Sequence, residues 1–328
     1  MSLEIISERF TLNGPRQAQW IKHKHVGDAY SLICQTLYSA ISTGTELAAY
    51  TGMASLSGGK IYPRVNGYMN VAKVLEVGSA VQGYRKDDII LTFNCHETHF
   101  IIPESAVLVK LDNDDLLTSY VYAYAYHLGY AALLKSAVPA GAKVAVIGQG
   151  LLGQAGAELL ASHGYYTTVI SDHVRHYEGV SHQPLLHFAG RDLDISGYFD
   201  LVILTTGSWH DYEFALDIAG QNGIVSVLGF PGRDGSRPEF NPLMPQKFYQ
   251  KQLTIQASGL APECNDTRGF NRFNEQDNLA HIVQMIADGM LIPTRFCSQR
   301  KSYEHLETIY HTLLERKADE ISAIISWS

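Results

Sequence analysis

The chain has 328 residues, of which 46 % are hydrophobic and 18 % are charged, and its formal net charge is −8. This length accommodates about two domains with sizeable apolar cores, and the composition is that of a packed chain rather than a disordered one. The acidic balance argues against nucleic acid or an anionic membrane as partner. No stretch approaches the roughly 18 apolar residues of a membrane span, and residues 1–10 lack a signal-peptide pattern, so we expect a cytoplasmic protein.

Residues 1 to about 118 consist of short apolar runs separated by turn residues. The runs are "YSLICQTLYSAIS", "VAKVLEVGSAV", "IILTF" and "THFIIPESAVLVKL". They are rich in β-branched and aliphatic residues, which favour strands. Many short strands with glycine and proline between them predict a small β-barrel-like domain.

The pattern changes near Thr118. Residues 118–137, "TSYVYAYAYHLGYAALLKSA", are long enough for one helix. From there to about residue 258, apolar strand patterns alternate with helical ones: "VAVIG", "LLGQAGAELLASHG", "TTVIS", "DLVILTTG", "HDYEFALDIAG" and "GIVSVLGF". This alternation is typical of βαβ units, so residues 119–258 predict an α/β domain with a doubly wound parallel sheet.

The last part of the chain returns to mixed patterns. Residues 261–276, "APECNDTRGFNRFNEQ", are polar and loop-like, and helices are expected at 277–289 and 303–317, before a final strand at 321–328. We expect residues 259–328 to pack back onto the N-terminal domain and complete it. The loops at 53–62 and 261–276 are expected to shape a pocket, although neither indicates a ligand.

The spacing Gly148-x-Gly150-x-x-Gly153 lies between an apolar strand and an apolar-periodic helix. This is the context that a dinucleotide-binding motif requires. Gly148 permits a tight turn, Gly150 lets a pyrophosphate approach the backbone, and Gly153 lets the helix lie close to the strand. The first helical residues, Leu151 and Leu152, present N–H groups and a partial positive charge to the phosphates.

Asp172 follows the next strand, 19 residues after Gly153. An acidic residue about 20 residues beyond the motif accepts hydrogen bonds from the adenosine ribose hydroxyls. The carboxylate would repel a 2′-phosphate, so NAD is the expected cofactor. NADP stays open as a possibility, because His173 and Arg175 are close enough in sequence to soften that preference.

Two further strands end in "LTTG" at 204–207 and "VLGF" at 227–230. Ligands of open parallel sheets bind beyond the carboxyl ends of the strands. Thr206, Gly207, Gly229 and Phe230 are therefore candidates to line the nicotinamide end of the cofactor site. An equally good interpretation of each residue by itself is an ordinary turn position.

The whole pattern resembles the medium-chain dehydrogenase/reductase superfamily, the family of the zinc alcohol dehydrogenases. The resemblance is most specific at "GTE" (44–46), "NGYMNVAKVLEVGSAV" (66–81), "GYAALLKSAVPAGAKVAVIGQGLLG" (129–153) and "NPLMPQKFYQKQLTIQAS" (241–258). It implies a GroES-like β-barrel-type catalytic domain, 1–118 with 259–328, and a Rossmann domain, 119–258. It also implies a homodimer joined at the Rossmann sheet edge, with "GIVSVLGF" (223–230) near that edge. The form "SAISTGTEL" is similar to a branch with bacteriochlorophyllide-type and sugar or inositol-type dehydrogenases.

The resemblance also locates the catalytic zinc, and the ligands are missing there. The first ligand position holds Ser42, the histidine and glutamate of the usual Gly-His-Glu fall at Tyr68 and Met69, and the last ligand falls near Tyr124. Zinc prefers thiolate, imidazole or carboxylate, whereas hydroxyls and phenols stay protonated and bind it poorly. We therefore expect no zinc and no metal site.

One other segment, "NCHETHF", contains Cys95, His96, Glu97 and His99. In a strand, Cys95, Glu97 and His99 would point one way and His96 the other, which disfavours a common metal site. We expect His96 to line the substrate cleft instead. The four cysteines of the chain are far apart and form no Cys-x-x-Cys pair, so neither a disulfide framework nor a zinc finger is expected.

Without a metal, hydrogen-bond donors must polarise a substrate carbonyl. Thr45 matches the hydroxyl relay residue of the superfamily, and Tyr68 is a candidate donor or acid. Tyr124 and His127 lie on the predicted helix and are expected to face the same space, with His127 suited to proton transfer near neutrality. Glu46 is expected to have a structural role. Core packing is an equally good explanation of the two tyrosines.

These observations favour a zinc-independent NAD(P)-dependent oxidoreductase acting on a small alcohol or carbonyl compound. An NADPH-dependent quinone or enoyl reductase is an alternative, which Asp172 disfavours. A second alternative is a dinucleotide-binding protein without turnover, which the missing metal ligands would permit.

Overall fold

The structure is a computed structural model that describes residues 3–53, 62–172, 184–192, 195–315 and 320–327. The chain divides into two compact units. Unit 1 contains residues 1–124 and 263–328, and unit 2 contains residues 125–262. In the described part of the chain, no helix has the length and apolar character that crossing a membrane requires.

Unit 2 is built on a six-stranded parallel sheet, with the strand order β11-β10-β9-β12-β13-β14. Its strands are β9 (Lys143–Ile147), β10 (Tyr166–Ile170), β11 (Leu186–Ala189), β12 (Phe199–Leu204), β13 (Ala219–Val227) and β14 (Thr254–Ala257). Numbered along the chain, this order is 3-2-1-4-5-6, the order of doubly wound dinucleotide-binding sheets. The predicted doubly wound parallel sheet is confirmed.

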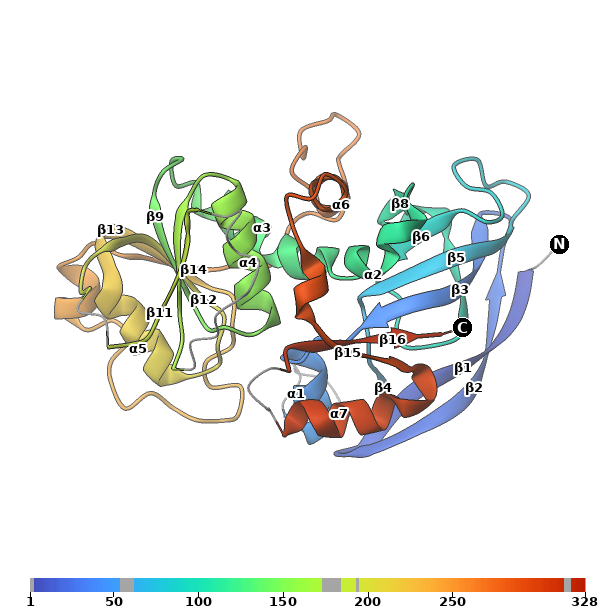
Figure 1. Ribbon diagram of the computed structural model, residues 1–328, viewed down its shortest axis with the longest axis horizontal. Coiled ribbons are helices and arrows are strands. Elements are labelled where there is room, and N and C mark those ends of the chain that lie inside the picture. Colours follow the sequence, from blue (N-terminus) through green and yellow to red (C-terminus); the bar gives the residue numbers. More distant parts are fainter. Residues whose placement is uncertain (1–2, 54–61, 173–183, 193–194, 316–319, 328) are drawn as a thin grey trace. The chain divides into compact units, whose positions relative to one another are not determined.

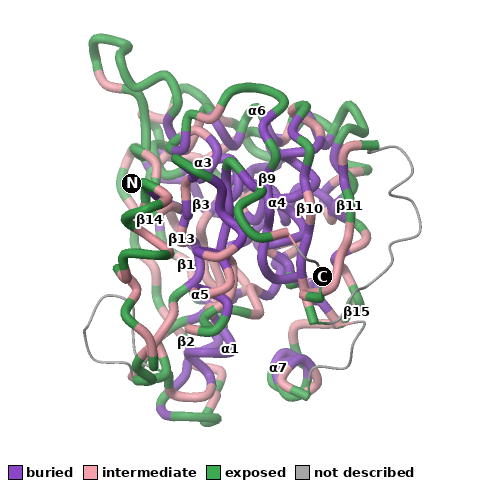
Figure 2. The backbone as a smooth tube through the Cα atoms, turned by 90° about the vertical axis from the view of Figure 1, so that its left-hand side faces the viewer, coloured by how far each residue is buried: buried purple, intermediate pink, exposed green. Residues whose placement is uncertain are grey.

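Helices cover this sheet on both faces, which explains why its central strands β9 and β12 are apolar and buried apart from one exposed charged residue each. Helix α4 (Leu151–Ser162) follows β9 and packs on β9 and β10, whereas α5 (Trp209–Ile218) packs on β12 and β13. Figure 1 shows α4 and α5 on opposite sides of the sheet. In Figure 2 the buried residues follow β9, β10 and α4.

Three features of this region differ from the sequence-based expectation. Strands β11 and β14 are four residues each and partly polar, and neither was identified. Since β14 is the edge strand, the segment 223–230 lies one strand in from the edge. The helix expected at 118–137 is two helices, α2 (Leu117–Tyr120) and α3 (Ala123–Ser136). At the break, the buried ring of Tyr122 packs edge-on against Phe296.

Unit 1 contains a seven-stranded sheet and a three-stranded sheet. The first has the order β15-β16-β3-β5-β6-β8 with β7 added on β3, and the second has the order β2-β1-β4. The strands are β1 (Leu3–Gly14), β2 (Gln17–Gly27), β3 (Ser31–Ala40), β4 (Arg64–Val65), β5 (Asn70–Val77), β6 (Ile89–Thr92), β7 (His99–Pro103), β8 (Val109–Leu111), β15 (Cys297–Ser302) and β16 (Ser322–Ser326). The C-terminal strand β16 pairs antiparallel with β3, so residues from both ends of the chain share this sheet.

The helices of unit 1 close its cores. They are α1 (Thr45–Thr51), α2, α6 (Glu275–Ala287) and α7 (Leu306–Leu314). Helices α1 and α7 pack together over an aromatic cluster in which Phe10 contacts Trp20 and Tyr310, and Trp20 contacts Trp327. A second core of Leu32, Val74, Phe100 and their neighbours lies inside the strands β3, β5, β6 and β7. The first core lies next to the loop that carries Ser42, and it therefore positions the candidate catalytic residues.

Candidate functional site

The turn after β9 has the geometry that its glycines predict. Gly148 has a φ of +105°, a conformation that side chains with a Cβ rarely adopt, and its N–H donates to the carbonyl oxygen of Ile170 at 2.9 Å. A Cβ on Gly148 would lie 2.6 Å from Thr205 Oγ1, and one on Gly153 would lie 2.0 Å from Gly148 O. Neither position tolerates a larger residue without movement of the backbone.

Gly150 is different, because a Cβ built there meets nothing within 4 Å. Gly150 is the N-cap of α4, and the open space on its surface leads to the first turn of that helix. The N–H groups of Leu151 and Leu152 belong to the four at a helix start that have no partner within the helix. Open space, available N–H groups and a helix N-terminus together fit a pyrophosphate.

The residues predicted to line the nicotinamide end come together at the carboxyl ends of β12 and β13. The N–H of Gly229 donates to the carbonyl oxygen of Leu204 at 2.7 Å, and a Cβ on Gly229 would lie 2.0 Å from Thr206 O. A Cβ on Gly207 would lie 3.3 Å from Phe230 O. The two loops therefore run side by side at the edge of the sheet where ligands of this topology bind.

Asp172 follows β10 and lies in an ion-pair network that sequence analysis did not find. Its Oδ1 lies 2.6 Å from Nε of Arg191, which follows β11, and Arg191 also pairs with Asp211 of α5. The short run "LHFA" ahead of Arg191, although partly polar, was the available signal for a strand with a functional residue at its end. His173 and Arg175, which were expected to soften the cofactor preference, lie outside the described residues.

The positions that hold zinc ligands in the resemblance do come together in unit 1. Tyr68 donates its phenol hydrogen to Ser42 Oγ. The rings of Tyr68 and Tyr124 meet edge-on with centroids 5.5 Å apart, and Phe93 packs on Tyr124 at 4.8 Å. Met69 is buried. The cluster thus consists of one aliphatic hydroxyl and two phenols, half-buried among aromatic rings.

This donor set is a poor one for a metal ion. Burial, with smaller contributions from Glu275 and Tyr68, raises the pKa of Tyr124 far above its usual value, so that phenol stays protonated. Within the described ranges, no three His, Cys, Asp or Glu side chains are grouped so that they could hold a metal. The residues present at this position therefore do not fit the catalytic zinc that the resemblance implies.

Glu46 holds the loop of Ser42 in place through hydrogen bonds. Its Oε1 accepts the N–H of Ser42 at 2.8 Å, and its Oε2 lies 2.8 Å from His96 Nε2 and accepts the hydroxyl of Tyr310. The other ring nitrogen of His96 lies 2.9 Å from Ser39 Oγ. His96 has no exposed surface, so the expectation that it lines a cleft is wrong. Because both ring nitrogens have partners, His96 instead ties Glu46 to β3.

The side chains of Cys95 and Glu97 contact each other and not the partners of His96, although Cys95 and His96 lie outside the strand that begins at His99. Glu97 Oε2 lies 2.9 Å from both Arg9 Nε and His25 Nε2, and Glu97 Oε1 accepts from Cys95 Sγ at 3.4 Å. Burial raises the pKa of Glu97, but hydrogen bonds from His25 and Arg9 outweigh it and bring the pKa to about 2. The pKa of His99 is lowered by burial. The cluster has the features of a structural ion-pair site.

The two remaining catalytic candidates are placed differently. Thr45 is the half-buried first residue of α1, three residues after Ser42. His127 on α3 is completely buried, and desolvation lowers its pKa to about 4. That value does not match the expectation of a group that titrates near neutrality, because a buried imidazole is costly to charge.

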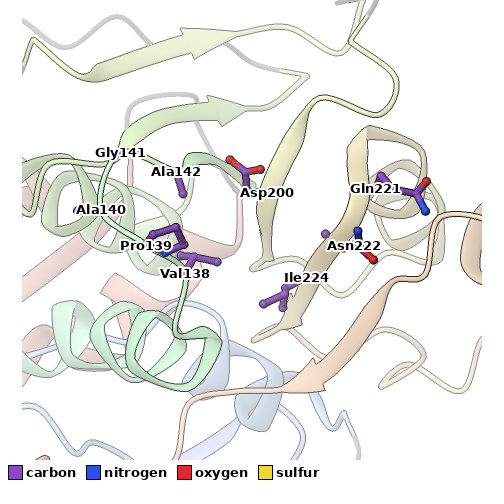
Figure 3. A pocket seen from close by; sticks show the side chains of 10 residues that line it. Val138, Pro139, Ala140, Gly141, Ala142, Asp200, Gln221, Asn222 and Ile224 are labelled. Carbon is purple, nitrogen blue, oxygen red and sulfur yellow. The ribbon is translucent and has the colours of Figure 1, made fainter.

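A pocket of about 460 Å³ lies at the opposite end of the unit 2 sheet (Figure 3). It is lined by residues that precede β9 and that begin β12 and β13, among them Pro139, Asp200 and Asn222. These are the amino ends of the strands, whereas ligands of doubly wound sheets bind at the carboxyl ends. The pocket is therefore separate from the candidate cofactor site.

No protein-family model matches the sequence, and no curated protein matches it. Solved structures match over almost the whole chain. Galactitol-1-phosphate dehydrogenase from Escherichia coli superposes with a TM-score of 0.78 at 13 % identity, covering 97 % of this chain and 99 % of its own. L-idonate 5-dehydrogenase from the same organism gives 0.78 at 13 % identity, covering 99 % of both chains. CAD from Helicobacter pylori, complexed with NADP(H), gives 0.74 at 16 % identity, again with 99 % of both chains. The chain thus has the fold of these dehydrogenase structures, as the resemblance implied.

Proposed function

We propose that this chain, which has the fold of the medium-chain dehydrogenase/reductase superfamily, is an NAD(P)-dependent oxidoreductase acting on a small alcohol or carbonyl compound. The observation that carries the proposal is the turn after β9, where Gly148 has a positive φ, a Cβ on Gly153 would collide with Gly148 O, and Gly150 borders open space. A tight turn, space for a pyrophosphate and close packing of the helix are the three features of a dinucleotide-binding turn. In the proposal, Gly150, Leu151 and Leu152 bind the phosphates, and Asp172 accepts hydrogen bonds from the ribose.

The bound nicotinamide would supply the hydride, and the chain must then orient the substrate and polarise its oxygen. Ser42 Oγ accepts the hydrogen of Tyr68, so the hydrogen of Ser42 itself remains available to donate to a substrate oxygen. A donor that also accepts a hydrogen bond is strengthened by it. Glu46 fixes the backbone of Ser42. Ser42, supported by Tyr68, would therefore carry out, as a neutral donor, the polarisation that a metal carries out in zinc enzymes.

Zinc independence is the part of this proposal that metal analysis tests most directly. The purified chain, prepared without chelator and dialysed against buffer containing zinc, is expected to carry well below one equivalent of zinc. The variant in which Ser42 is replaced by cysteine and Tyr68 by histidine restores two ligand types and serves as the positive comparison. One tightly held zinc per unaltered chain would contradict the proposed role of Ser42 and Tyr68.

Coenzyme binding and turnover are separate tests. Titration with NADH and with NADPH, followed by energy transfer from tryptophan to the nicotinamide, is expected to reveal binding of at least one coenzyme. A panel of alcohols, sugars, aldehydes and enones with each coenzyme then tests turnover. Binding without any turnover would support the alternative of a non-catalytic dinucleotide-binding protein, and turnover confined to quinones or enones with NADPH would support the reductase alternative. Binding of neither coenzyme would refute the proposal.

The proposal includes a homodimer joined through the edge of the unit 2 sheet. On this side of the sheet the edge strand is β14 (Thr254–Ala257), and among the residues that the structure describes its strand partner is β13. An exposed strand edge presents unpaired N–H and C=O groups to a second copy. Replacing Ile255 by proline is expected to convert the dimer to a monomer in sedimentation velocity, and a mass unaffected by this change would rule out the β14 edge.

A further inference from the structure

Three side chains surround the guanidinium of Arg191: two carboxylates at ion-pair distance and one imidazole. Nε lies 2.6 Å from Asp172 Oδ1, one terminal nitrogen pairs with Asp211 Oδ1, and the other lies 2.8 Å from His210 Nδ1. Because a guanidinium only donates, His210 Nδ1 accepts and carries no hydrogen. Arg191 thus connects the loop after β11 to the loop after β10 and to the first turn of α5.

The two carboxylates that pair with Arg191 lie in different surroundings. The side chain of Asp211 is only 4 % exposed, and its other oxygen accepts the hydroxyl of Thr206. The side chain of Asp172 is 62 % exposed. Separating a buried carboxylate from its cation leaves an uncompensated charge, whereas an exposed carboxylate turns into water at little cost. Arg191 therefore remains with Asp211, and Asp172 is the partner that a ligand can replace.

The position of this arginine bears on the choice of coenzyme. In doubly wound sheets, the acidic residue after the second strand lies at the adenosine ribose. By itself, Asp172 would repel a phosphate on the ribose 2′ oxygen. Here a fixed cation lies directly beside that carboxylate, on the side of β11, so an anion arriving at Asp172 also meets a guanidinium that is already oriented. Charge-assisted contacts of this kind are among the strongest hydrogen bonds in proteins.

We propose that Arg191 binds the 2′-phosphate of NADP(H) in exchange for the Asp172 carboxylate, so that the chain accepts both NAD(H) and NADP(H). The inference rests on the proposed dinucleotide function. With NAD(H), Asp172 stays on Arg191, and its second oxygen accepts a ribose hydroxyl. With NADP(H), the phosphate takes the place of the carboxylate, which turns into solvent, while Asp211 and His210 keep the guanidinium in position.

The test compares the dissociation constants of NADH and NADPH, measured by fluorescence titration of the full chain. The dissociation constants of the unaltered chain for NADH and NADPH are expected to lie within about tenfold of each other. Arg191→Met is expected to weaken NADPH by about tenfold or more and NADH by much less, because only the phosphate loses a charged partner. Asp172→Asn is expected to shift the preference the other way, strengthening NADPH and weakening NADH.

Two further variants serve as a control for charge and as a substitute in case Arg191→Met does not fold. Lys143→Met removes one cation from the amino end of β9, at the opposite edge of the same sheet, and is expected to leave the NADPH-to-NADH ratio unchanged. The double variant Arg191→Met with Asp211→Asn replaces Arg191→Met if the single change, which leaves Asp211 buried without its cation, prevents folding. Asp172 is exposed, so its variant is expected to fold in either case.

The possible outcomes separate this inference from the function on which it rests. Binding of neither coenzyme by the unaltered chain contradicts the dinucleotide function and the inference with it. Binding of NADH with no NADPH binding, or an equal loss of both coenzymes in Arg191→Met, overturns the inference and leaves the function intact. A selective loss of NADPH in the arginine variant, with Lys143→Met unaltered, supports it.

Discussion

Gly129 of α3 and Gly156 of α4 lie against each other: a Cβ on Gly129 would lie 2.5 Å from the Cα of Gly156. A Cβ on Gly156 would lie 3.5 Å from the Cα of Gly129, which is an ordinary contact. Tyr126 and Glu158, within three residues of these glycines on the same two helices, are joined by a buried hydrogen bond. The close approach of α3 thus supports the helix that begins at the glycine turn.

Because this contact is asymmetric, replacing Gly129 by alanine and replacing Gly156 by alanine are expected to have different effects on stability. Gly129→Ala is expected to lower the melting temperature by several degrees, because a Cβ there forces the two backbones apart, and 1 kcal/mol corresponds to about 2–4 °C in a domain of this size. Gly156→Ala is expected to be neutral or to stabilise the chain by up to about 1 kcal/mol, since alanine is the better helix former. Calorimetry of both variants measures the difference, and equal melting temperatures would contradict it.

In the glycine turn, we expect one substitution to affect coenzyme binding and another to affect stability. Gly150→Ala is expected to leave the melting temperature unchanged, because its Cβ enters open space, and to weaken coenzyme binding by occupying the place of the pyrophosphate. Gly153→Ala is expected to destabilise the chain, since its Cβ would lie 2.0 Å from Gly148 O. Thermal unfolding and coenzyme titration of the two variants are the measurements.

The outcome for Gly150 decides what the open space is for. If Gly150→Ala binds NADH and NADPH as tightly as the unaltered chain, the space beside Gly150 is not a phosphate site. The glycines of this turn would then serve only the packing of α4 against the sheet.

The parts of the fold that sequence analysis predicted are those whose signal is local. The apolar run of β9, the glycine turn and the periodic helix α4 follow one another within about 20 residues, and each carries its own pattern. Strands β11 and β14 were missed because four partly polar residues become a strand only when a neighbouring strand supplies hydrogen bonds. The break between α2 and α3 was missed for a related reason, since it coincides with the tertiary packing of Tyr122 on Phe296.

The same distinction applies to the candidate site. The position of Asp172 follows from its spacing after Gly153, but its partners Arg191 and Asp211 lie on other loops, and their meeting depends on the strand order. Burial was the other property that residue type did not reveal. His96 was expected to line the substrate cleft and His127 to transfer a proton there, and both are completely buried.

The pair formed by Tyr68 and Ser42 predicts a catalytic effect without a binding effect. Ser42→Ala removes the proposed donor and is expected to lower kcat by about a hundredfold, the scale found for single oxyanion donors. Tyr68→Phe removes only the support of that donor, and we expect about a tenfold decrease. Coenzyme affinity should stay unchanged in both variants. Tyr30→Phe, at an exposed tyrosine, is the matched control, and equal activity of Tyr30→Phe and Tyr68→Phe would exclude a role for the phenol of Tyr68.

His127 predicts a loss of stability on mild acidification. Its pKa is 6.5 in an ordinary environment and about 4 in the fold, because burial disfavours the charged ring. The unfolded chain therefore binds a proton that the folded chain does not, and the free energy of unfolding falls as the pH decreases from 6.5 towards 4. His127→Gln, which does not titrate, is expected to show a flatter pH dependence of the melting temperature over this range. Identical profiles for the two proteins would mean that His127 is not buried as the structure places it.

Glu97 makes its contribution at lower pH. Its ordinary pKa is 4.5, and in the fold burial raises it while the hydrogen bonds from His25 and Arg9 lower it more strongly, to about 2. Because the folded form holds the ionised carboxylate more tightly, Glu97 stabilises the chain above pH 4.5, and this stabilisation, about 3 kcal/mol, is lost as the pH falls towards 2. Glu97→Gln is expected to be less stable at pH 7 and to lose less further stability between pH 4.5 and 2. Urea unfolding of both proteins at a series of pH values measures their free energies of unfolding. The other carboxyl groups titrate in both proteins, so only Glu97 can change the difference between them. A difference that stays constant between pH 4.5 and 2 would show that the pairing of Glu97 with Arg9 and His25 contributes nothing to stability.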